Sequence, residues 1–248
     1  MQIIRPIEMS LCAIRGISAE TEAKLRRDGI QTWAQLARVA GKRFSDEKGV
    51  LVRERIRRAM ICRDCGMVDH FVNALPIGHR VRIIAEVYAQ TLFLDVETDA
   101  CTSASRITCL STLFNGEVKT FVRDVDLDMF LPVWSKAKLL VTFNGVRFDI
   151  PKIKKEFGFS ANPPHVDLMC EAAHYGFRGG LKRVESDLGF RRAKSIGKNG
   201  RDAVDLWWRY KSAGDVAAFH ELLEYNREDV LALDFVYRRL YQFSFENF

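Results

Sequence analysis

The sequence has no run of about 18 apolar residues, the length that a helix needs to cross a bilayer, so a transmembrane helix is excluded. The first residues also lack the basic stretch followed by an apolar stretch that is typical of a signal peptide. We therefore expect a cytoplasmic protein with no membrane partner.

Cysteine is sparse, with six residues scattered over 248 positions, which is not the dense pattern of a disulfide-stabilised domain. Cys62 and Cys65 form a Cys-x-x-Cys, but a structural zinc site needs two more ligands. No second Cys-x-x-Cys or His pair follows at a suitable spacing, and His70 stands alone nearby. Two ordinary thiols are therefore favoured over a zinc site.

The composition is not that of a disordered chain, because 48% of the residues are hydrophobic. The length suits one large α/β domain with a small appendage, or two modest domains. The net charge of +6 is uneven: residues 1–90 hold 16 Lys and Arg against 10 Asp and Glu, and the remainder holds 22 of each. A basic appendage on a neutral domain indicates a polyanionic partner, and a solvated basic face is the alternative.

The early part of the chain is predicted to consist of short helices joined by tight turns. Its apolar residues recur at helical spacing, and turns are expected near Gly16 and Gly29. Ser18 and Thr32 stand where helix N-caps are expected, and Gly29 suits the position just after a helix end.

A longer basic helix is predicted at about Asp46–Arg63, and no proline-rich or glycine-rich linker follows it. The character of the chain changes only further on, where apolar strand patterns begin. We therefore predict a small all-helical, basic domain over residues 1–75 and a second domain over residues 76–248.

The second domain shows strand patterns and then helix patterns. Short apolar, β-branched runs predict five strands: Thr91–Asp95, Ile107–Phe114, Val118–Val122, Leu139–Phe143 and His165–Asp167. Asn115-Gly116 is a strong hairpin signal. Helices are predicted at Asp126–Lys136, around Pro151, and at Leu168–Tyr175, Leu181–Leu188, Asp202–Ser212 and Val216–Tyr241. This order predicts an α/β fold with a mixed five-stranded sheet flanked by helices.

Two carboxylates stand close together at the end of the first strand. Asp95 and Glu97 are two residues apart, so their side chains point to one face of the strand. Like charges this close are costly unless a cation neutralises them, and oxygen ligands favour Mg²⁺ or Mn²⁺. Taken alone, a structural role for the pair is the competing interpretation.

Further carboxylates occur later in the chain. Asp149 follows the fourth strand and precedes Pro151, so it is also a candidate helix N-cap. Tyr225 and Asp229 are four residues apart and would share one helix face, which could equally be an ordinary amphipathic surface.

The combination of these groups resembles the DEDD superfamily of 3′–5′ exonucleases, which have the ribonuclease H-like fold. The motifs are Phe93-Leu94-Asp95-Val96-Glu97-Thr98, Phe143-Asn144-Gly145-x-x-Phe148-Asp149-Ile150-Pro151 and Tyr225-x-x-x-Asp229. Tyrosine in the third motif is typical of the DEDDy branch, and the second motif resembles the proofreading domains of B-family polymerases. The segments His165-Val166-Asp167-Leu168, Gly180-Leu181-Lys182-Arg183-Val184-Glu185 and Tyr225-Asn226-x-x-Asp229-Val230 are most similar to the YprB-type predicted exonuclease family.

The resemblance implies a phosphodiesterase with two divalent cations, Mg²⁺ or Mn²⁺. It implies that Asp95 bridges both cations, that Glu97 and Asp229 complete the site of the attacking water, and that Asp149 holds the second cation. It further implies that Tyr225 orients the nucleophile and that 5′-nucleotides are released from a 3′ end.

Other polar residues are candidates for substrate contacts. Lys182, Arg183 and a basic loop over residues 191–201, which contains Lys198 and Arg201, could hold backbone phosphates. A solvated flexible loop is the alternative. Asn144 could contact the terminal nucleotide or only cap a turn, and Asp167 is favoured as a helix N-cap. Trp207 and Trp208 could stack on bases, although one core residue and one half-exposed neighbour are favoured.

The segment Ile14-Arg15-Gly16-Ile17-Ser18 and the residues up to Leu36 resemble a helix-hairpin-helix module. Such hairpins bind a phosphate through backbone N–H groups at a helix N-terminus. The usual pattern has a second glycine where Ser18 stands, and a small packing or partner-binding module is the alternative.

Together, these patterns predict a 3′–5′ exonuclease that acts on nucleic acid, with DNA favoured over RNA and a single-stranded 3′ end as substrate. A structure-specific or endonucleolytic nuclease on the same fold is one alternative. A catalytically inactive nucleic-acid-binding module is the other. The sequence identifies no protein partner.

Overall fold

The computed structural model describes residues 5–192 and 200–246 of the chain. The chain divides into two compact units, Met1–Tyr88 with Leu240–Phe248, and Ala89–Arg239. Over the described ranges, every helix is too short or too polar to traverse a lipid bilayer.

The first unit is helical, as its sequence pattern predicts. It contains the 3-10 helices η1 (Pro6–Met9) and η2 (Leu11–Ala13), and the helices α1 (Ala19–Arg27), α2 (Trp33–Arg43), α3 (Asp46–Asp64), α4 (Val68–Ala74) and α5 (Val81–Glu86). The predicted N-caps are confirmed: Ser18 Oγ accepts a hydrogen bond from Thr21 N at 3.1 Å, and Thr32 forms a capping box with Gln35. Gly29 follows the end of α1 with φ of +80°, a conformation that favours glycine.

The interior of the first unit combines an aromatic pair with a buried charge network. Trp33 is fully buried, stacks on Phe71 at 6.0 Å between ring centroids, and donates from Nε1 to Ser10 O at 2.9 Å. Glu22 and Arg82 are both fully buried and form an ion pair of 2.6 Å. The core of the unit therefore contains a buried ion pair, in which Glu22 also contacts Arg26 at 2.9 Å.

The Cys-x-x-Cys does not gather further ligands. Cys62 is buried, Cys65 is exposed, and both are free thiols. Within the described ranges, three side chains that could share a metal ion lie in the second unit. They are Asp95, Glu97 and Asp229. The interpretation of Cys62 and Cys65 as ordinary thiols stays a prediction.

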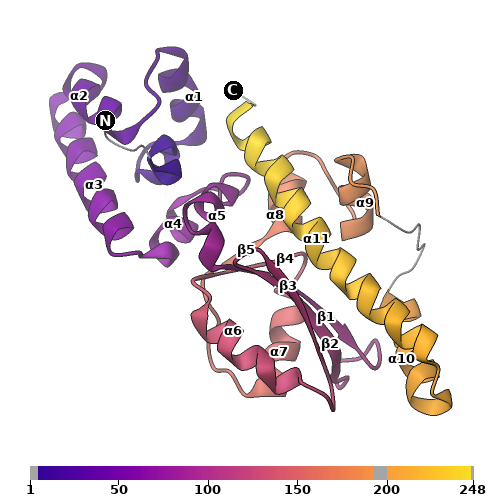
Figure 1. The fold of residues 1–248 in the computed structure, drawn as a ribbon. Helices are drawn as coiled ribbons and strands as arrows, with labels where there is room; N and C mark the ends of the chain where they lie inside the picture. The colour runs from indigo at the N-terminus through magenta and orange to yellow at the C-terminus, as the bar shows by residue number, and fades with distance from the viewer. Residues whose placement is uncertain (1–4, 193–199, 247–248) are drawn as a thin grey trace. The chain divides into compact units, whose positions relative to one another are not determined.

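The second unit contains the predicted mixed five-stranded sheet, which is confirmed (Figure 1). Its strands are β1 (Thr91–Thr98), β2 (Ile107–Phe114), β3 (Glu117–Val122), β4 (Leu139–Thr142) and β5 (His165–Asp167). The strand order is β3-β2-β1-β4-β5, with β1 antiparallel to β2 and parallel to β4. The strand that carries the paired carboxylates is thus the central one. At the predicted hairpin, Asn115 and Gly116 have φ of +51° and +79°, the two positive values that a type I′ turn requires.

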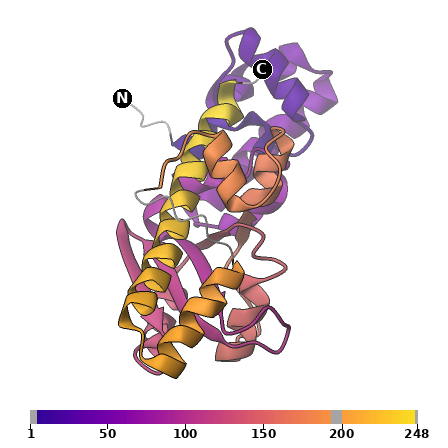
Figure 2. The same ribbon diagram turned by 90° about the vertical axis from the view of Figure 1, so that its right-hand side faces the viewer.

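Helices cover both faces of this sheet. They are α6 (Leu131–Lys136), α7 (Asp149–Phe157), α8 (Leu168–His174), α9 (Leu181–Asp187), α10 (Gly200–Ala213) and α11 (Val216–Glu246). One face packs Leu92 and Leu94 against Trp134 of α6 and Ile153 of α7. The other face packs β2 and β3 against α10 and the first turns of α11, which lie side by side in both views (Figure 1, Figure 2).

One predicted helix is partly wrong. In place of a continuous helix over Asp126–Lys136, the chain forms the 3-10 helix η4 (Leu127–Phe130) and then α6. Pro132 explains the break, because proline has no N–H and fits only the first turn of a helix. The helix therefore starts anew at Leu131.

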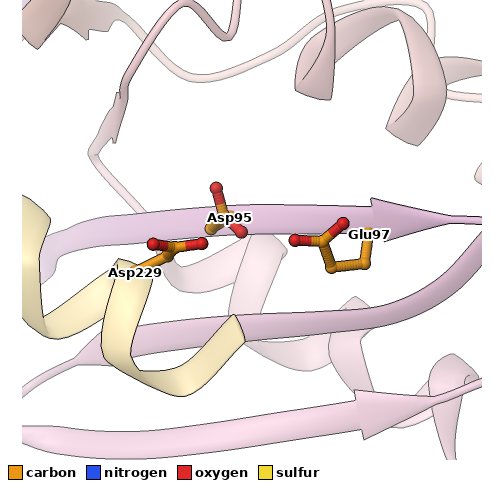
Figure 3. Close-up of side chains that lie close together, drawn as sticks. All are labelled: Asp95, Glu97 and Asp229. Carbon is orange, nitrogen blue, oxygen red and sulfur yellow. The ribbon is translucent and has the colours of Figure 1, made fainter. Parts of the chain in front are cut away.

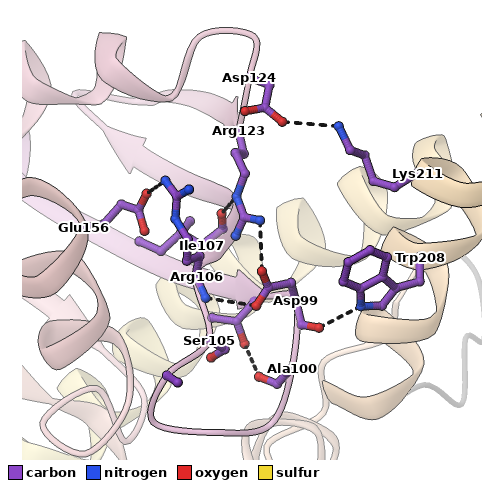
Figure 4. Close-up of polar contacts among 12 residues, drawn as sticks. Asp99, Ala100, Ser105, Arg106, Ile107, Arg123, Asp124, Glu156, Trp208 and Lys211 are labelled. Atoms are coloured by element: carbon purple, nitrogen blue, oxygen red, sulfur yellow. Dashed lines mark hydrogen bonds and ion pairs between the residues drawn. The ribbon is translucent and has the colours of Figure 1, made fainter.

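The connection between β1 and β2 is anchored to α10 by polar contacts around Asp99 (Figure 4). Arg106 N donates to Asp99 Oδ1 at 2.9 Å, and Arg123 pairs with Asp99 Oδ2 at 2.9 Å. Trp208 donates from Nε1 to Asp99 O at 2.8 Å and remains half exposed, whereas Trp207 is buried. This confirms the interpretation of the two tryptophans as a core residue and a half-exposed neighbour.

Candidate active site

Strand alternation turns the two carboxylates of β1 to the face of the sheet that α11 covers. Leu94 and Val96 belong to the apolar core on the opposite face. Phe93, on the same side as Asp95 and Glu97, packs on Tyr237 of α11 at 5.8 Å between ring centroids. The period of two in an extended strand is sufficient to place both carboxylates against α11.

A third carboxylate reaches this face from α11. Figure 3 shows Asp229 beside β1, next to Asp95 and Glu97. One carboxylate oxygen from each of these three residues lies within 4.8 Å of the others. Residues separated by more than a hundred positions are thus brought together by the packing of one helix on the central strand.

Asp149 lies close to the triad but is held differently. It is buried, and its Oδ1 accepts a hydrogen bond from Val96 N at 3.0 Å. The alternative interpretation of Asp149 as a helix N-cap is wrong, because α7 begins at Asp149 itself and the N-cap position is Phe148. The carboxylate therefore accepts a hydrogen bond from the β1 backbone between Asp95 and Glu97, and it is not the N-cap of α7.

The mutual repulsion of these carboxylates is large because they share a buried site. Burial raises the pKa of Asp95 well above its usual range, and Asp229, Asp149 and Glu97 raise it further. Burial and the charges of Asp229 and Asp149 likewise raise the pKa of Glu97. Burial raises the pKa of Asp149 to about 7. The site thus carries more negative charge than the protein itself neutralises.

Two residues at the site were not expected from sequence. Asn226 is fully buried and donates from Nδ2 to Asp95 Oδ2 at 2.6 Å. Arg192 pairs with Asp229 Oδ1 at 2.5 Å and with Glu185 Oε1 at 2.6 Å. Asn226 stands in the motif that contains Tyr225, which is the signal that could have identified it. Arg192 belongs to the basic loop that suggested phosphate contacts, and two carboxylates hold its guanidinium.

Tyr225 lies one turn of α11 before Asp229 and is buried. Burial, and then the charge of Asp229, raises the pKa of its phenol, so it stays protonated. Lys182 Nζ lies 4.4 Å from the centroid of the Tyr225 ring and is buried without a hydrogen-bond partner in the described residues. The structure therefore places a phenol and an ammonium next to the carboxylates.

The other candidate substrate residues are more scattered. Arg183 is exposed and pairs with Asp187 on its own helix, and Arg201 is exposed on α10. Lys198 lies outside the described residues. Asn144 lines the same cavity as the carboxylates and has φ of +63°. The roles of these residues in nucleic-acid binding stay predictions.

The loop after β4 is fixed by a second set of polar contacts. Asp167 Oδ1 accepts from Asn144 N at 2.7 Å and from Met169 N at 3.1 Å, so the predicted N-cap role of Asp167 is confirmed. Gly145 N donates to Thr142 Oγ1 at 3.1 Å. One carboxylate therefore holds both the start of α8 and the loop that leads to Asp149.

We expect Gly145→Ala to lower the free energy of unfolding by about 1–3 kcal/mol, the usual cost of overpacking. The added Cβ would stand 2.0 Å from Thr142 Oγ1 and 2.5 Å from Thr142 Cβ. Urea denaturation followed by circular dichroism measures the change. Gly200→Ala is the matched control, because no atom of residues 5–192 or 200–246 lies within 4 Å of the Cβ that it adds. A Gly145→Ala protein as stable as the wild type would contradict the close packing of this turn.

The carboxylates line a cavity of about 1180 Å³. Asp95, Glu97, Asp149 and Asp229, with Tyr225 beside them, form one part of its wall. Other parts come from the β1–β2 connection, the loop after β4, Lys152 of α7, α8 and the start of α9. Ligand sites commonly have volumes of about 300–1,000 Å³, so the cavity can admit a nucleotide-sized group next to the carboxylates.

Comparisons with known proteins agree with this fold. A family model described as the RNase_H superfamily matches residues 92–241. The family B DNA polymerase from the hyperthermophilic archaeon Pyrobaculum calidifontis is a solved structure that resembles this one with a TM-score of 0.43 and 14% sequence identity. That match covers 58% of this chain and 24% of the polymerase chain, so this chain spans about a quarter of the polymerase. No curated protein matches the sequence significantly.

Proposed function

The chain belongs to the RNase H superfamily, and from this premise we propose that it is a metal-dependent 3′–5′ exonuclease of the DEDDy type. The observation that carries the proposal is the buried cluster of Asp95, Glu97 and Asp229, with Asp149 adjacent, in the wall of a nucleotide-sized cavity. Such an enzyme is a phosphodiesterase that hydrolyses a P–O bond and releases 5′-nucleotides.

The donor atoms of the cluster fit divalent cations. All are carboxylate oxygens, which Mg²⁺ and Mn²⁺ prefer, and all belong to buried or half-buried side chains. The raised pKa values of Asp95 and Glu97 show that the site is short of positive charge. Asp95, Glu97 and Asp229 would hold one cation, and Asp149 with Asp95 would hold the second. When bound, the two cations would supply an activated water at neutral pH and stabilise charge on the phosphate.

Neighbouring side chains have separate tasks in this proposal. Asn226 fixes the orientation of the Asp95 carboxylate through its 2.6 Å hydrogen bond. The protonated phenol of Tyr225 orients the attacking water by a hydrogen bond. Lys182, whose ammonium lies over the Tyr225 ring, contributes positive charge toward the phosphate. Asn144 contacts the terminal nucleotide from the opposite wall of the cavity.

The finer assignment rests on the third motif. Tyr225 and Asp229 are one turn apart on α11, the arrangement that the DEDDy branch and the YprB-type family imply for this pair. We propose a single-stranded 3′ end as substrate, with DNA favoured over RNA. We further propose that residues 76–248 carry the hydrolysis, and that residues 1–75, with their helix-hairpin-helix-like segment, help to hold the nucleic acid.

A panel of end-labelled DNA and RNA oligonucleotides, with Mg²⁺ or Mn²⁺, tests the proposal. We expect a ladder of products shortened from the 3′ end and no cleavage of a circular single strand, which has no end. Cleavage of the circle would instead favour the endonucleolytic alternative. Failure to hydrolyse any substrate, with no Mn²⁺ binding in titration calorimetry, would favour the inactive binding module.

Tyr225→Phe is expected to lower kcat by about 10–100-fold, because it removes one hydrogen bond to a charged or reacting group. Asp229 and the other carboxylates are unchanged, so Mn²⁺ affinity should stay within about twofold of the wild type. Single-turnover kinetics and titration calorimetry measure the two quantities. Tyr210→Phe, on α10, is the matched control, since Tyr210 does not line the cavity. An unchanged kcat in Tyr225→Phe would remove this residue from the mechanism.

The stability of the metal-free protein is expected to fall as the pH rises from about 4 to about 7. Unfolded carboxyls titrate near pH 4, whereas burial raises the pKa of folded Asp149 to about 7 and raises that of Asp95. Between these values the folded state binds more protons than the unfolded state, so the free energy of unfolding decreases with pH. Thermal unfolding in EDTA measures this slope, and Mn²⁺ should reduce it. A flat profile in EDTA would contradict the repulsive cluster.

A further inference from the structure

We propose that the first unit carries a separate binding site for the phosphodiester backbone of nucleic acid, built around Arg15, Arg55 and Arg58. The inference rests on the proposed function only in the choice of ligand, since a nuclease must hold a polyanionic chain. It adds Arg55 and Arg58 of α3, which the hairpin resemblance does not include, to Arg15 of the hairpin-like segment.

The site is a cavity of about 650 Å³ formed entirely within the first unit. Its polar lining comes from the turn before α1, from α3 and from α4: Arg15, Glu54, Arg55, Arg58, His70 and Asn73. Ile17 and Leu51 add an apolar part, and Leu51 is 41% exposed. The cavity thus combines several positive donors with an apolar wall, which suits a phosphate and its attached sugar and base.

The arginines of this cavity differ from others in the same unit. Arg26 pairs with Glu22, Arg63 with Glu8 and Arg43 with Asp28. By contrast, in the described part of the chain no ion pair involves Arg15, Arg55 or Arg58. Glu54 is the one acidic residue in the cavity lining. Uncompensated positive charge therefore gathers in one concave place, where it attracts anions most strongly.

The cationic groups are held in a defined arrangement. Arg55 Nη1 donates to Arg15 O at 2.6 Å, so its guanidinium lies against the turn before α1. Gly16 permits this approach, because a Cβ there would stand 2.5 Å from Arg55 Nη1. Arg55 and Arg58 are three residues apart on α3, and residues at this spacing share a helix face. The remaining N–H groups of these arginines can donate to phosphate oxygens in the cavity.

The matched test compares neighbouring arginines on α3. Arg58 and Arg57 are both exposed and carry the same charge, but only Arg58 lines the cavity. Binding of a fluorescein-labelled 20-mer of single-stranded DNA is measured by anisotropy with the full chain in EDTA, which stops metal-dependent hydrolysis. We expect Arg58→Gln to raise Kd about 5–10-fold and to reduce the salt slope by about one, as for a lost phosphate contact. Arg57→Gln should change Kd less than twofold.

Glu54→Gln provides a test of opposite sign, because it removes the negative charge from the cavity lining. We expect it to lower Kd about 2–5-fold. Equal losses in Arg58→Gln and Arg57→Gln, or no loss in Arg58→Gln, would overturn the site. A failure of Glu54→Gln to tighten binding would also count against it.

Two further arms identify the source of the phosphate and separate this inference from the proposed function. Deoxyadenosine monophosphate and inorganic phosphate are added as competitors: displacement of the 20-mer by the mononucleotide at micromolar concentration would overturn a backbone site in favour of a mononucleotide site. Hydrolysis of bis-p-nitrophenyl phosphate with Mn²⁺ is measured in parallel and should be equal in the wild type and Arg58→Gln. A chain that hydrolyses nothing but keeps the contrast between Arg58 and Arg57 would retain this site and lose the nuclease assignment.

Discussion

Asp95→Asn is expected to reduce hydrolysis of a labelled oligonucleotide by about 1000-fold or more, while the metal-free protein becomes more stable. Asp95 interacts with Glu97, Asp149 and Asp229, since each of their charges raises its pKa. In the proposed mechanism Asp95 would be a ligand to both cations, so its loss would remove several kcal/mol of transition-state stabilisation, and about 1.4 kcal/mol corresponds to tenfold in rate.

The gain in stability has the same physical origin as the loss of activity. An amide is nearly the size of the carboxylate but carries no charge, so it relieves the repulsion inside the buried cluster. The amide oxygen can still accept the hydrogen bond from Asn226 Nδ2, which bonds Asp95 Oδ2 at 2.6 Å in the native chain. We therefore expect the Tm of Asp95→Asn in EDTA to rise by several degrees above that of the wild type.

Both readouts are needed, because their opposite signs distinguish a functional site from a damaged fold. Asp205→Asn, at an exposed position of α10, is the control for the change of charge and should alter neither quantity. Addition of Mn²⁺ should raise the Tm of the wild type and leave that of Asp95→Asn nearly unchanged. Full activity in Asp95→Asn, or a lower Tm in EDTA, would end the case for a cation site at this cluster.

The sequence predicts the parts of the fold that depend on neighbouring residues. The Asn115-Gly116 turn, the caps at Ser18 and Thr32 and the alternation of β1 all follow from local rules, and each is found as expected. The order of strands does not follow from such rules, because a parallel neighbour such as β4 is set by a crossover and not by a turn. The sequence therefore predicts a mixed five-stranded sheet but not the order of its strands.

In the candidate site, too, local sequence rules do not predict contacts between residues that are far apart in the chain. Asp149 was a plausible N-cap by local criteria, yet its carboxylate accepts a hydrogen bond at 3.0 Å from the backbone N–H of Val96, in strand β1. Arg192 stands in a basic segment whose composition predicts exposure to solvent. Its side chain is nevertheless buried, and it forms ion pairs with Glu185 and Asp229. A charged residue is expected to be exposed to solvent unless an oppositely charged partner is known. That partner is identified only once the folded structure brings distant residues together.

Arg82 is the clearest case of a residue that the sequence does not mark, and Arg82→Ala is expected to lower the free energy of unfolding by about 3–5 kcal/mol. Its guanidinium is fully buried, pairs with Glu22 Oε1 at 2.6 Å and lies 4.1 Å from the centroid of the Phe245 ring. It also donates from Nε to Ser244 Oγ at 3.2 Å, so it joins segments 162 positions apart within the first unit.

The loss of stability in Arg82→Ala arises mainly from the Glu22 carboxylate, which remains buried without its main counter-ion, and less from the contacts that Arg82 itself makes. Glu22 would stay buried with only Arg26 to compensate it, although Glu22 Oε2 still accepts from Cys12 N at 2.6 Å. Burial raises the pKa of Glu22, but the charge of Arg82, the hydrogen bonds from Cys12 and the charge of Arg26 together lower it overall. Without Arg82 we expect protonation of the carboxyl, or unfolding of the unit, to become more favourable.

A double-mutant cycle separates these contributions. Glu22→Gln with Arg82→Met replaces both charges by groups of similar volume, and buried ion pairs replaced in this way often cost little or nothing. We therefore expect the double variant to be more stable than Arg82→Ala in urea denaturation. At acid pH, where Glu22 is protonated, the loss in Arg82→Ala should shrink, because the uncompensated charge disappears. A loss independent of pH, or a double variant no better than Arg82→Ala, would show that packing on Phe245 and the bonds to Ser244 dominate over the ion pair.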